Sequence, residues 1–268
     1  MKNTLRLLTT LATCFFCPAI TFSQTFHKTI GGAGNDVANY VVAADSGFLI
    51  AGATSSFGNG DLDATLLFID DLGNPLWQKT YGGSGDQVFH FAIATSDGGF
   101  LACGDSKNTG QSLREIFLVK SDQRGVVIWS KVWNSGFDDF PVALIEIAGG
   151  DYMLSGLRRI GNSNRSIIAR IDATGNQLWS KVYSNSINNL IRIEYADGPT
   201  GYLSGAIDEH ACFGKMDLSN GQFFGGKNYR GSHTEALYHL RPLADGNFIM
   251  SNHSWSPTNG LKLEQWVQ

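Results

Sequence analysis

The 268-residue sequence has few charged side chains, 16% of the total, only six prolines and only four cysteines. It contains no run of lysine and arginine, and its net charge at neutral pH is −4, so neither nucleic acid nor an acidic lipid surface is an expected partner. Because 43% of the residues are hydrophobic and 12% aromatic, the chain can bury a large core, which excludes disorder, a coiled coil and a collagen-like helix. The 32 glycines favour a turn-rich all-β protein.

An apolar stretch covers residues 7–22, follows two basic residues and ends in small side chains before Gln24. This pattern is typical of a secretory signal peptide over residues 1–23, since the stretch is short for a membrane span. We therefore expect a secreted or cell-surface protein whose mature part, residues 24–268, is a single domain without a membrane span.

Two of the four cysteines lie within the predicted leader, which leaves Cys103 and Cys212 in the mature chain. A disulfide framework is therefore not expected. The sequence has no Cys-x-x-Cys pair, no His-Glu-x-x-His string and no calcium-loop string, so no metal and no cofactor is expected. It also lacks the glycine motifs of phosphate loops, dinucleotide sites and nucleophile elbows.

A repeat of about fifty residues organises the rest of the sequence. One marker is a turn that leads into an apolar run ending in glycine, at Gly52, Gly104 and Gly156. A second marker is an Asp followed by a Gly and then by a Trp, which is the first residue of a Trp-x-Lys-x-aromatic string. These strings begin at Trp77, Trp129 and Trp179, with a degraded copy at residues 225–229.

Each repeat contains four runs of strand-forming residues separated by Gly and Asp turns, which predicts the four-stranded antiparallel blade of a β-propeller. Residues 25–32 match the outer strand of the first repeat, residues 76–83, without a gap, whereas the fifth repeat ends after three strands. We therefore predict a five-bladed β-propeller whose last blade is closed by the N-terminal strand. Closure would pair a strand edge that is otherwise exposed.

The Asp-Gly-Gly-Phe and Trp-x-Lys-x-Tyr-Gly-Gly strings resemble those of secreted bacterial β-propeller repeat proteins, which often carry a type IX secretion sorting domain. The resemblance covers residues 25–268. It implies the propeller fold and a surface or extracellular role in general terms.

Residues kept in every repeat are interpreted as structural. The tryptophans could be platforms for sugars, but a side chain kept in each blade more often packs that blade against the next. The strand lysines are expected on the outermost strand, where they discourage edge pairing. The aspartates that follow the third strand are expected to cap the next turn, at Asp70, Asp122, Asp172 and Asp217.

Residues that differ between repeats are more informative about function. Glu146 and Glu194 stand three residues before a turn on the expected inner strands of neighbouring blades, and Arg192 shares a strand face with Glu194. Two acids near the axis could hydrolyse a glycosidic bond as acid and base, or as acid and nucleophile. An ion pair of Arg192 with Glu194 explains the same residues without chemistry, and we favour that structural explanation because buried charges need partners.

The fifth repeat contains a second polar cluster. With Ala244 opposite Phe248, the two strand histidines would face each other, whereas a two-residue turn at 245–246 would place them on opposite faces. Both registers stay open, and hydrogen bonds of the histidines to backbone carbonyls are the simpler explanation. The cluster consists of Glu235, His239, His253 and Trp255.

From these features we predict a monomeric, non-enzymatic binding module for a glycan or a surface protein. Arg192 and the fifth-repeat cluster would form its site, and loop aromatics such as Phe57 and Trp255 would stack on the ligand. One alternative is a glycoside hydrolase or lyase that uses Glu146 and Glu194. Another is a structural or adhesion element without a small ligand.

Overall fold

The computed structural model describes residues 26–59, 61–183, 190–207, 210–229, 234–256 and 260–267. The predicted signal peptide, residues 1–23, lies outside this part of the chain. The described residues form 19 strands and no helix, so the prediction of an all-β protein is confirmed.

The strands form five antiparallel sheets that follow one another along the chain, numbered sheets 1 to 5. Sheet 1 contains β1 (Asp36–Ala44), β2 (Gly47–Thr54), β3 (Asp63–Ile69) and β4 (Pro75–Tyr81). Sheet 2 contains β5 (Gly85–Ala94), β6 (Phe100–Asn108), β7 (Glu115–Ser121) and β8 (Val127–Trp133). Sheet 3 contains β9 (Asp138–Glu146), β10 (Tyr152–Ile160), β11 (Ser163–Ile171) and β12 (Gln177–Tyr183). Sheet 4 contains β13 (Leu190–Asp197), β14 (Thr200–Ile207), β15 (His210–Asp217) and β16 (Gln222–Tyr229). Sheet 5 contains β17 (Thr234–Pro242), β18 (Phe248–Ser256) and β19 (Gly260–Val267).

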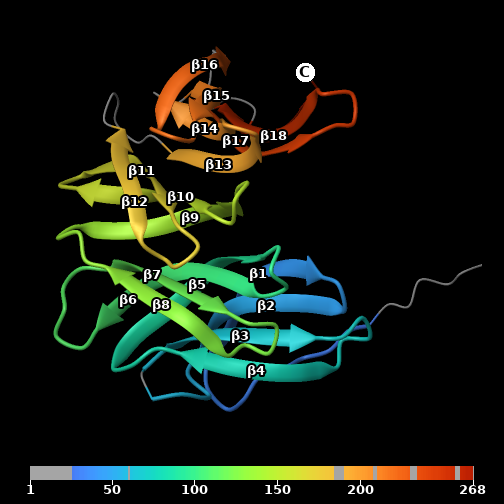
Figure 1. The fold of residues 1–268 in the computed structure, drawn as a ribbon, viewed down its shortest axis with the longest axis vertical. Helices are drawn as coiled ribbons and strands as arrows, with labels where there is room; N and C mark the ends of the chain where they lie inside the picture. Colours follow the sequence, from blue (N-terminus) through green and yellow to red (C-terminus); the bar gives the residue numbers. More distant parts are fainter. Residues whose placement is uncertain are drawn as a thin grey trace, which may run out of the picture.

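The sheets are arranged as in a β-propeller, each packed face to face on the next (Figure 1). Their first strands, β1, β5, β9, β13 and β17, pack against one another in succession and form the inner side. Each hydrophobic core cluster joins two neighbouring sheets, so the core is divided among the seams rather than gathered at one centre.

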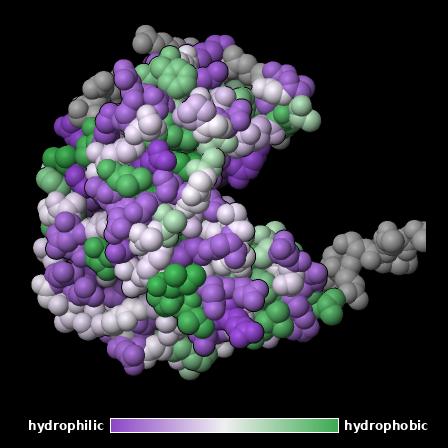
Figure 2. All heavy atoms as spheres, in the orientation of Figure 1, coloured by the Kyte–Doolittle hydropathy of each residue, from purple (hydrophilic) through white to green (hydrophobic). Residues whose placement is uncertain are grey.

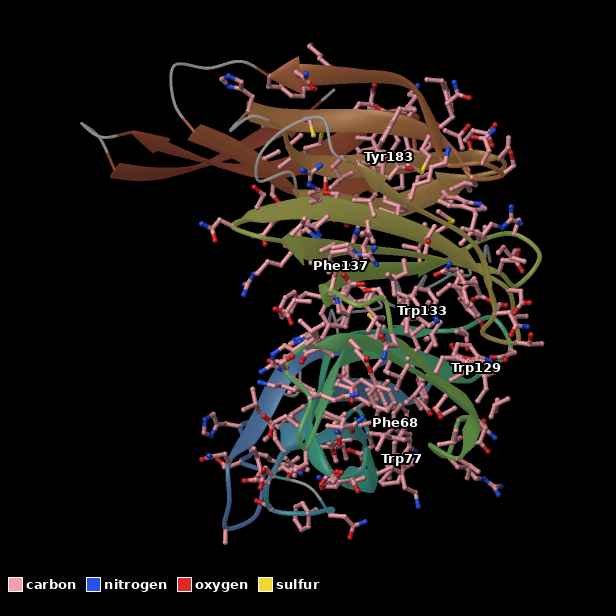
Figure 3. The ribbon with its side chains drawn as sticks, turned by 90° about the vertical axis from the view of Figure 1, so that its left-hand side faces the viewer. Phe68, Trp77, Trp129, Trp133, Phe137 and Tyr183 are labelled. Carbon is pink, nitrogen blue, oxygen red and sulfur yellow. The ribbon has the colours of Figure 1, made fainter. Side chains whose placement is uncertain are left out.

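The repeated tryptophans pack each sheet against the next, as predicted, and Figure 3 shows Trp77 and Trp129 at successive levels of the stack. A Cβ atom on Gly125 would lie 2.8 Å from the Trp77 ring, so only glycine allows this approach. The indole nitrogen of each tryptophan also donates a hydrogen bond to a backbone carbonyl of the next sheet. The pairs are Trp77 with Gln123, Trp129 with Ala173 and Trp179 with Leu218.

The aspartates after the third strands cap the following turns, which also confirms the sequence analysis. Asp70, for example, accepts hydrogen bonds from the backbone N–H groups of Leu72 and Asn74 at 2.9 and 2.7 Å. Asp122 and Asp172 make the same pair of contacts in their own turns.

The repeated glycine of the second strand has a steric cause. In sheets 1 to 3 the inner strand has a β-bulge immediately after the residue that pairs with this glycine. A Cβ atom on Gly104 would lie 1.7 Å from the carbonyl oxygen of Val88, and one on Gly52 would lie 1.8 Å from that of Val37. The two strands can approach this closely only where the side chain is a hydrogen atom.

The predicted closure of the last blade by the N-terminal strand is wrong. Val267 of β19 pairs with Ile249 of β18, and no described strand pairs with the other edge of β19. Figure 2 shows the described chain with a C-shaped outline, open on one side. Five sheets are present, but the fifth has three strands, so a complete fifth blade is not confirmed.

The N-terminal segment instead packs on sheet 1. The ring of Phe26 covers Gly73, as Trp77 covers Gly125, and Lys28 Nζ donates a hydrogen bond of 2.5 Å to Asn74 Oδ1. The matched string therefore keeps the side-chain contact of an outer strand with the following sheet, but not the backbone pairing with the preceding one. The two interactions are physically separate, and the sequence match could not distinguish them.

Replacing Gly104 with alanine should destabilise the fold by about 1–3 kcal/mol, because the new methyl group would overlap the Val88 carbonyl. Gly83→Ala is the matched control, since a Cβ atom there would meet nothing within 4 Å. Chemical unfolding followed by circular dichroism measures both. Equal stability of the two variants would contradict the steric explanation.

Candidate functional site

Charged side chains gather where the inner strands of sheets 4 and 5 meet. We call this group the Glu194 cluster. The central carboxylate accepts hydrogen bonds from side chains of its own sheet and lies beside an imidazole and a guanidinium of the next sheet. The cluster consists of Arg192 and Glu194 on β13, Ser204 on β14, and His239 and Arg241 on β17.

The carboxylate of Glu194 is buried, whereas two of its partners are exposed to solvent. Arg192 Nε donates to Glu194 Oε1 at 2.9 Å, and Arg241 Nη1 lies 3.4 Å from Oε2. His239 Nδ1 lies 3.5 Å from the same Oε2. The side chain of Glu194 is 5% exposed, whereas those of His239 and Arg241 are 51% and 59% exposed. A molecule in solvent can therefore reach the imidazole and one guanidinium directly.

A shifted β-bulge positions this carboxylate. In sheet 4 the residue that pairs with Gly205 is Ile191, so the rule of sheets 1 to 3 would place the bulge at Arg192. The bulge lies two residues later, at Glu194 between Ile193 and Tyr195. Bulges change the direction of a side chain and are enriched beside functional sites.

The electrostatics keep Glu194 ionised. Burial alone would raise the pKa of this carboxyl group, but the hydrogen bond with His239 and the charges of Arg192 and His239 outweigh burial and lower the pKa. Burial also raises the pKa of Tyr40 on β1, and this hydroxyl responds to the charges of Arg241, Glu194 and Arg192.

The two predicted acids, Glu146 and Glu194, have different partners in the structure. Arg192 and Glu194 form the predicted ion pair. Glu146 instead accepts hydrogen bonds from the N–H and hydroxyl of Ser96, at 2.7 and 2.6 Å, in the turn of the preceding sheet. The carboxylate of Glu146 therefore contacts sheet 2, whereas that of Glu194 contacts sheet 5, and the two are not brought into contact.

The register of the fifth repeat differs from both expected registers. Pro242 pairs with Phe248, a five-residue turn follows Pro242, and a further bulge lies between Leu237 and His239. His239 therefore pairs with Ser251 and not with His253, which pairs with Ala236. In the backbone ladder Glu235 pairs with Ser254 and Trp255 pairs with Thr234. Among the predicted residues of this repeat, the structure joins His239 to the Glu194 cluster.

Phe57, the other predicted stacking residue, is exposed in the loop between β2 and β3 of sheet 1. It thus belongs to the opposite end of the series of sheets from β17 and β18.

The sequence analysis missed two groups of residues. Arg241 completes the Glu194 cluster, and its signal was a charge on an inner strand of the fifth repeat. The second group is a buried carboxylate, Asp105, which contacts His90 Nε2 and Arg114 Nη1. Burial alone would raise the pKa of Asp105, but hydrogen bonds from those two side chains lower it. Asp105 follows the repeated Gly104, where sheet 1 has Ala53, so comparison of the repeats could have found it.

Within the described ranges, no three His, Cys, Asp or Glu side chains are grouped so that they could hold a metal ion. Cys103 and Cys212 are buried free thiols. Burial raises the pKa of Cys212 to about 12, which makes this thiol a poor nucleophile at neutral pH. The described part of the chain also has no helix with the length and apolarity needed to cross a membrane.

Comparisons of sequence find no relative: no protein-family model matches the chain, and no curated protein matches it either. Solved structures match its fold. A puromycin hydrolase is 14% identical, with a TM-score of 0.53 over 90% of this chain and 41% of that chain. A GH43 endo-arabinanase from Bacillus licheniformis is 14% identical, with a TM-score of 0.38 over 91% and 96%. An exo-β-1,3-galactanase from Phanerochaete chrysosporium is 12% identical, with a TM-score of 0.46 over 90% and 61%.

These matches support the β-propeller fold and correct one prediction. The sequence analysis favoured a non-enzymatic binding module, and this prediction is corrected because the solved structures named above are those of enzymes. At identities of 15% or less the likeness concerns the fold, so residues are not carried over from these proteins.

Replacing Glu194 with glutamine should lower stability at neutral pH, because Arg192 then loses its buried carboxylate partner. The pKa of Glu194 is lowered from 4.5, so its contribution is fully present above pH 4.5 and is lost as the pH falls through the folded-state value. Thermal unfolding of the wild type and Glu194→Gln should therefore differ most near pH 7 and converge in acid.

Glu146→Gln is the matched control, because its carboxylate accepts hydrogen bonds from Ser96. It should show a smaller difference from the wild type at pH 7. A gap between the wild type and Glu194→Gln that is the same at pH 3 as at pH 7 would show that the ionised carboxylate is not the stabilising form.

Proposed function

We propose that the chain is a glycan-cleaving enzyme, a glycoside hydrolase, that works at the Glu194 cluster. The observation that carries the proposal is a carboxylate that is buried yet held ionised, beside an imidazole that solvent can reach. A predicted leader over residues 1–23 would export the enzyme, and secretion or a place at the cell surface would bring it to extracellular polysaccharide.

Hydrolysis of a glycosidic bond requires two proton-handling groups. One carboxylate activates water or attacks the sugar, and an acid protonates the leaving oxygen. Glu194 suits the first role because its carboxylate is ionised. His239 suits the second, since an imidazole can carry a proton near neutral pH; its Nδ1 faces Glu194, so the proton for the leaving oxygen would be delivered from Nε2.

The remaining side chains of the Glu194 cluster would orient the sugar. Arg241 is exposed and presents guanidinium donors beside the carboxylate, where they can hold hydroxyl or carboxylate oxygens of a glycan. Arg192 and Ser204 are less exposed and would fix the direction of Glu194.

The sequence analysis assigned the same activity to the pair of Glu146 and Glu194. Because the two carboxylates contact different sheets, we propose the pair of Glu194 and His239 instead. The experiment below separates these two assignments.

The purified chain should release reducing ends from at least one polysaccharide in a panel of arabinan, β-1,3-galactan and xylan, the polymers that the names of the similar structures suggest. Glu194→Gln and His239→Gln should each lower kcat about 100-fold or more, because each removes a group that transfers a proton or attacks the sugar. Glu146→Gln should keep the activity of the parent.

Circular dichroism at the assay temperature shows whether each variant is folded. A pH profile of kcat provides a second readout, since His239→Gln should remove its alkaline limb. If Glu146→Gln is inactive and His239→Gln is active, the pair of glutamates is correct. Full activity of Glu194→Gln would refute the proposed site.

A further inference from the structure

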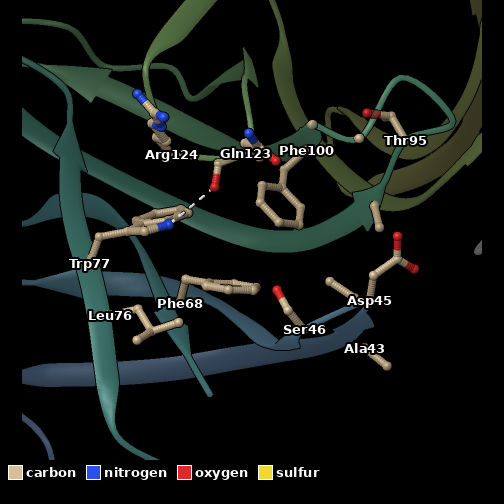
Figure 4. A pocket seen from close by; sticks show the side chains of 14 residues that line it. Ala43, Asp45, Ser46, Phe68, Leu76, Trp77, Thr95, Phe100, Gln123 and Arg124 are labelled. Atoms are coloured by element: carbon tan, nitrogen blue, oxygen red, sulfur yellow. Dashed lines mark hydrogen bonds between the residues drawn. The ribbon is translucent and has the colours of Figure 1, made fainter. Parts of the chain in front are cut away.

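A cleft of about 610 Å³ lies between sheets 1 and 2, away from the Glu194 cluster. Its floor is aromatic, formed by Phe68 on β3, Trp77 on β4 and Phe100 on β6 (Figure 4). Its sides are the turn between β1 and β2, with Asp45, and two turns of sheet 2, the one between β5 and β6 and the one between β7 and β8.

The neighbouring sheets have a cation at the position of Phe68. Phe68 pairs with Leu49, Lys120 pairs with Leu101, and Arg170 pairs with Met153, so the three side chains occupy the same place in their sheets. Lys120 and Arg170 are thus the counterparts of Phe68 in sheets 2 and 3.

Both cations bind an aspartate of the turn between the first two strands of their own sheet. Lys120 is 2% exposed, and its Nζ lies 2.9 Å from Asp97 Oδ2. Arg170 Nη2 lies 2.7 Å from Asp151 Oδ2, and its Nη1 also donates to the Leu218 carbonyl of the next sheet at 3.4 Å.

The seam between sheets 1 and 2 has the corresponding hydrogen-bond acceptors but lacks the cation. Asp45 is in the corresponding turn, and in the described part of the chain no lysine, arginine or histidine forms an ion pair with it. The Gln123 carbonyl, which corresponds to that of Leu218, receives the indole N–H of Trp77 at 3.2 Å. Between sheets 3 and 4 the corresponding carbonyl, that of Leu218, accepts hydrogen bonds from both the Trp179 indole and the Arg170 guanidinium.

The turn of sheet 1 is also shorter. It contains two residues, Asp45 and Ser46, whereas the corresponding turns of sheets 2 and 3 contain five, residues 95–99 and 147–151. The shorter turn covers less of the seam, and the cleft lies above the rings of Phe68 and Phe100, which are 6% and 3% exposed. Arg124 also lines the cleft, but Figure 4 shows it across the cleft from Asp45, so the negative end is at Asp45.

We propose that this cleft binds an organic cation, a guanidinium or ammonium group on a short apolar stem. The charged head takes the place of the missing Lys or Arg and contacts Asp45, at the end of the cleft away from Arg124. The stem lies along Phe68 and Phe100, as the aliphatic part of a lysine or arginine lies along apolar surface. The site is separate from the Glu194 cluster and does not depend on the proposed hydrolysis.

The test uses n-butylguanidinium as the probe and N-butylurea as a neutral compound of the same shape. Calorimetric titration of the full chain should show n-butylguanidinium binding about three to five times more tightly than N-butylurea, since an ion pair with the exposed Asp45 is worth about that factor. Equal affinities would overturn the proposal.

Two variants locate the site. Asp45→Asn should weaken n-butylguanidinium binding about three- to five-fold, whereas Asp197→Asn, at an exposed acid of sheet 4, should leave it unchanged. Phe68→Arg supplies the side chain of sheet 3 and should remove binding by filling the cleft. Unchanged binding in Asp45→Asn would refute the site, and this readout stands even if Phe68→Arg fails to fold.

Discussion

The arrangement of the sheets depends on the contact that the outer strand of sheets 1, 2 and 3 makes with the next sheet. An aromatic ring on that strand covers a turn glycine, and its indole N–H bonds to a carbonyl of the same turn. The contact has a direction, since each of sheets 1 to 3 reaches forward to its successor. Phe26 has no strand of its own, yet it makes the same contact with Gly73, which shows that the side-chain interaction alone can place a segment.

The cleft between sheets 1 and 2 and the Glu194 cluster both lie where one sheet differs from the other copies of the repeat. In the seam after sheet 1, a phenylalanine replaces the cation of the neighbouring sheets and a cleft remains. In sheet 4 the bulge moves by two residues and places Glu194 among cationic groups of two sheets. A repeated fold can tolerate such changes because each seam has its own core cluster, so one altered seam does not disturb the packing of another.

Much of the fold was predictable because the repeat encodes local chemistry. The caps at Asp70 and its equivalents, the packing of Trp77 and the pairing of Arg192 with Glu194 all follow from residue type and spacing. The direction of Glu146 was not predictable, since its partner Ser96 is 50 residues away in another sheet. The register of sheet 5 was missed because the turn after Pro242 and the bulge after Leu237 each shift the pairing.

The sequence by itself determined the strands, their order within each sheet and the residues that join one sheet to the next, because these depend on contacts repeated in every copy. Only the tertiary structure decided that the N-terminal segment packs on sheet 1 without pairing with β19. It also decided which charges meet, since Glu194, His239 and Arg241 come from two sheets and a shifted bulge. Contacts between different copies depend on how the sheets are placed in space, and a repeat in one dimension does not contain that information.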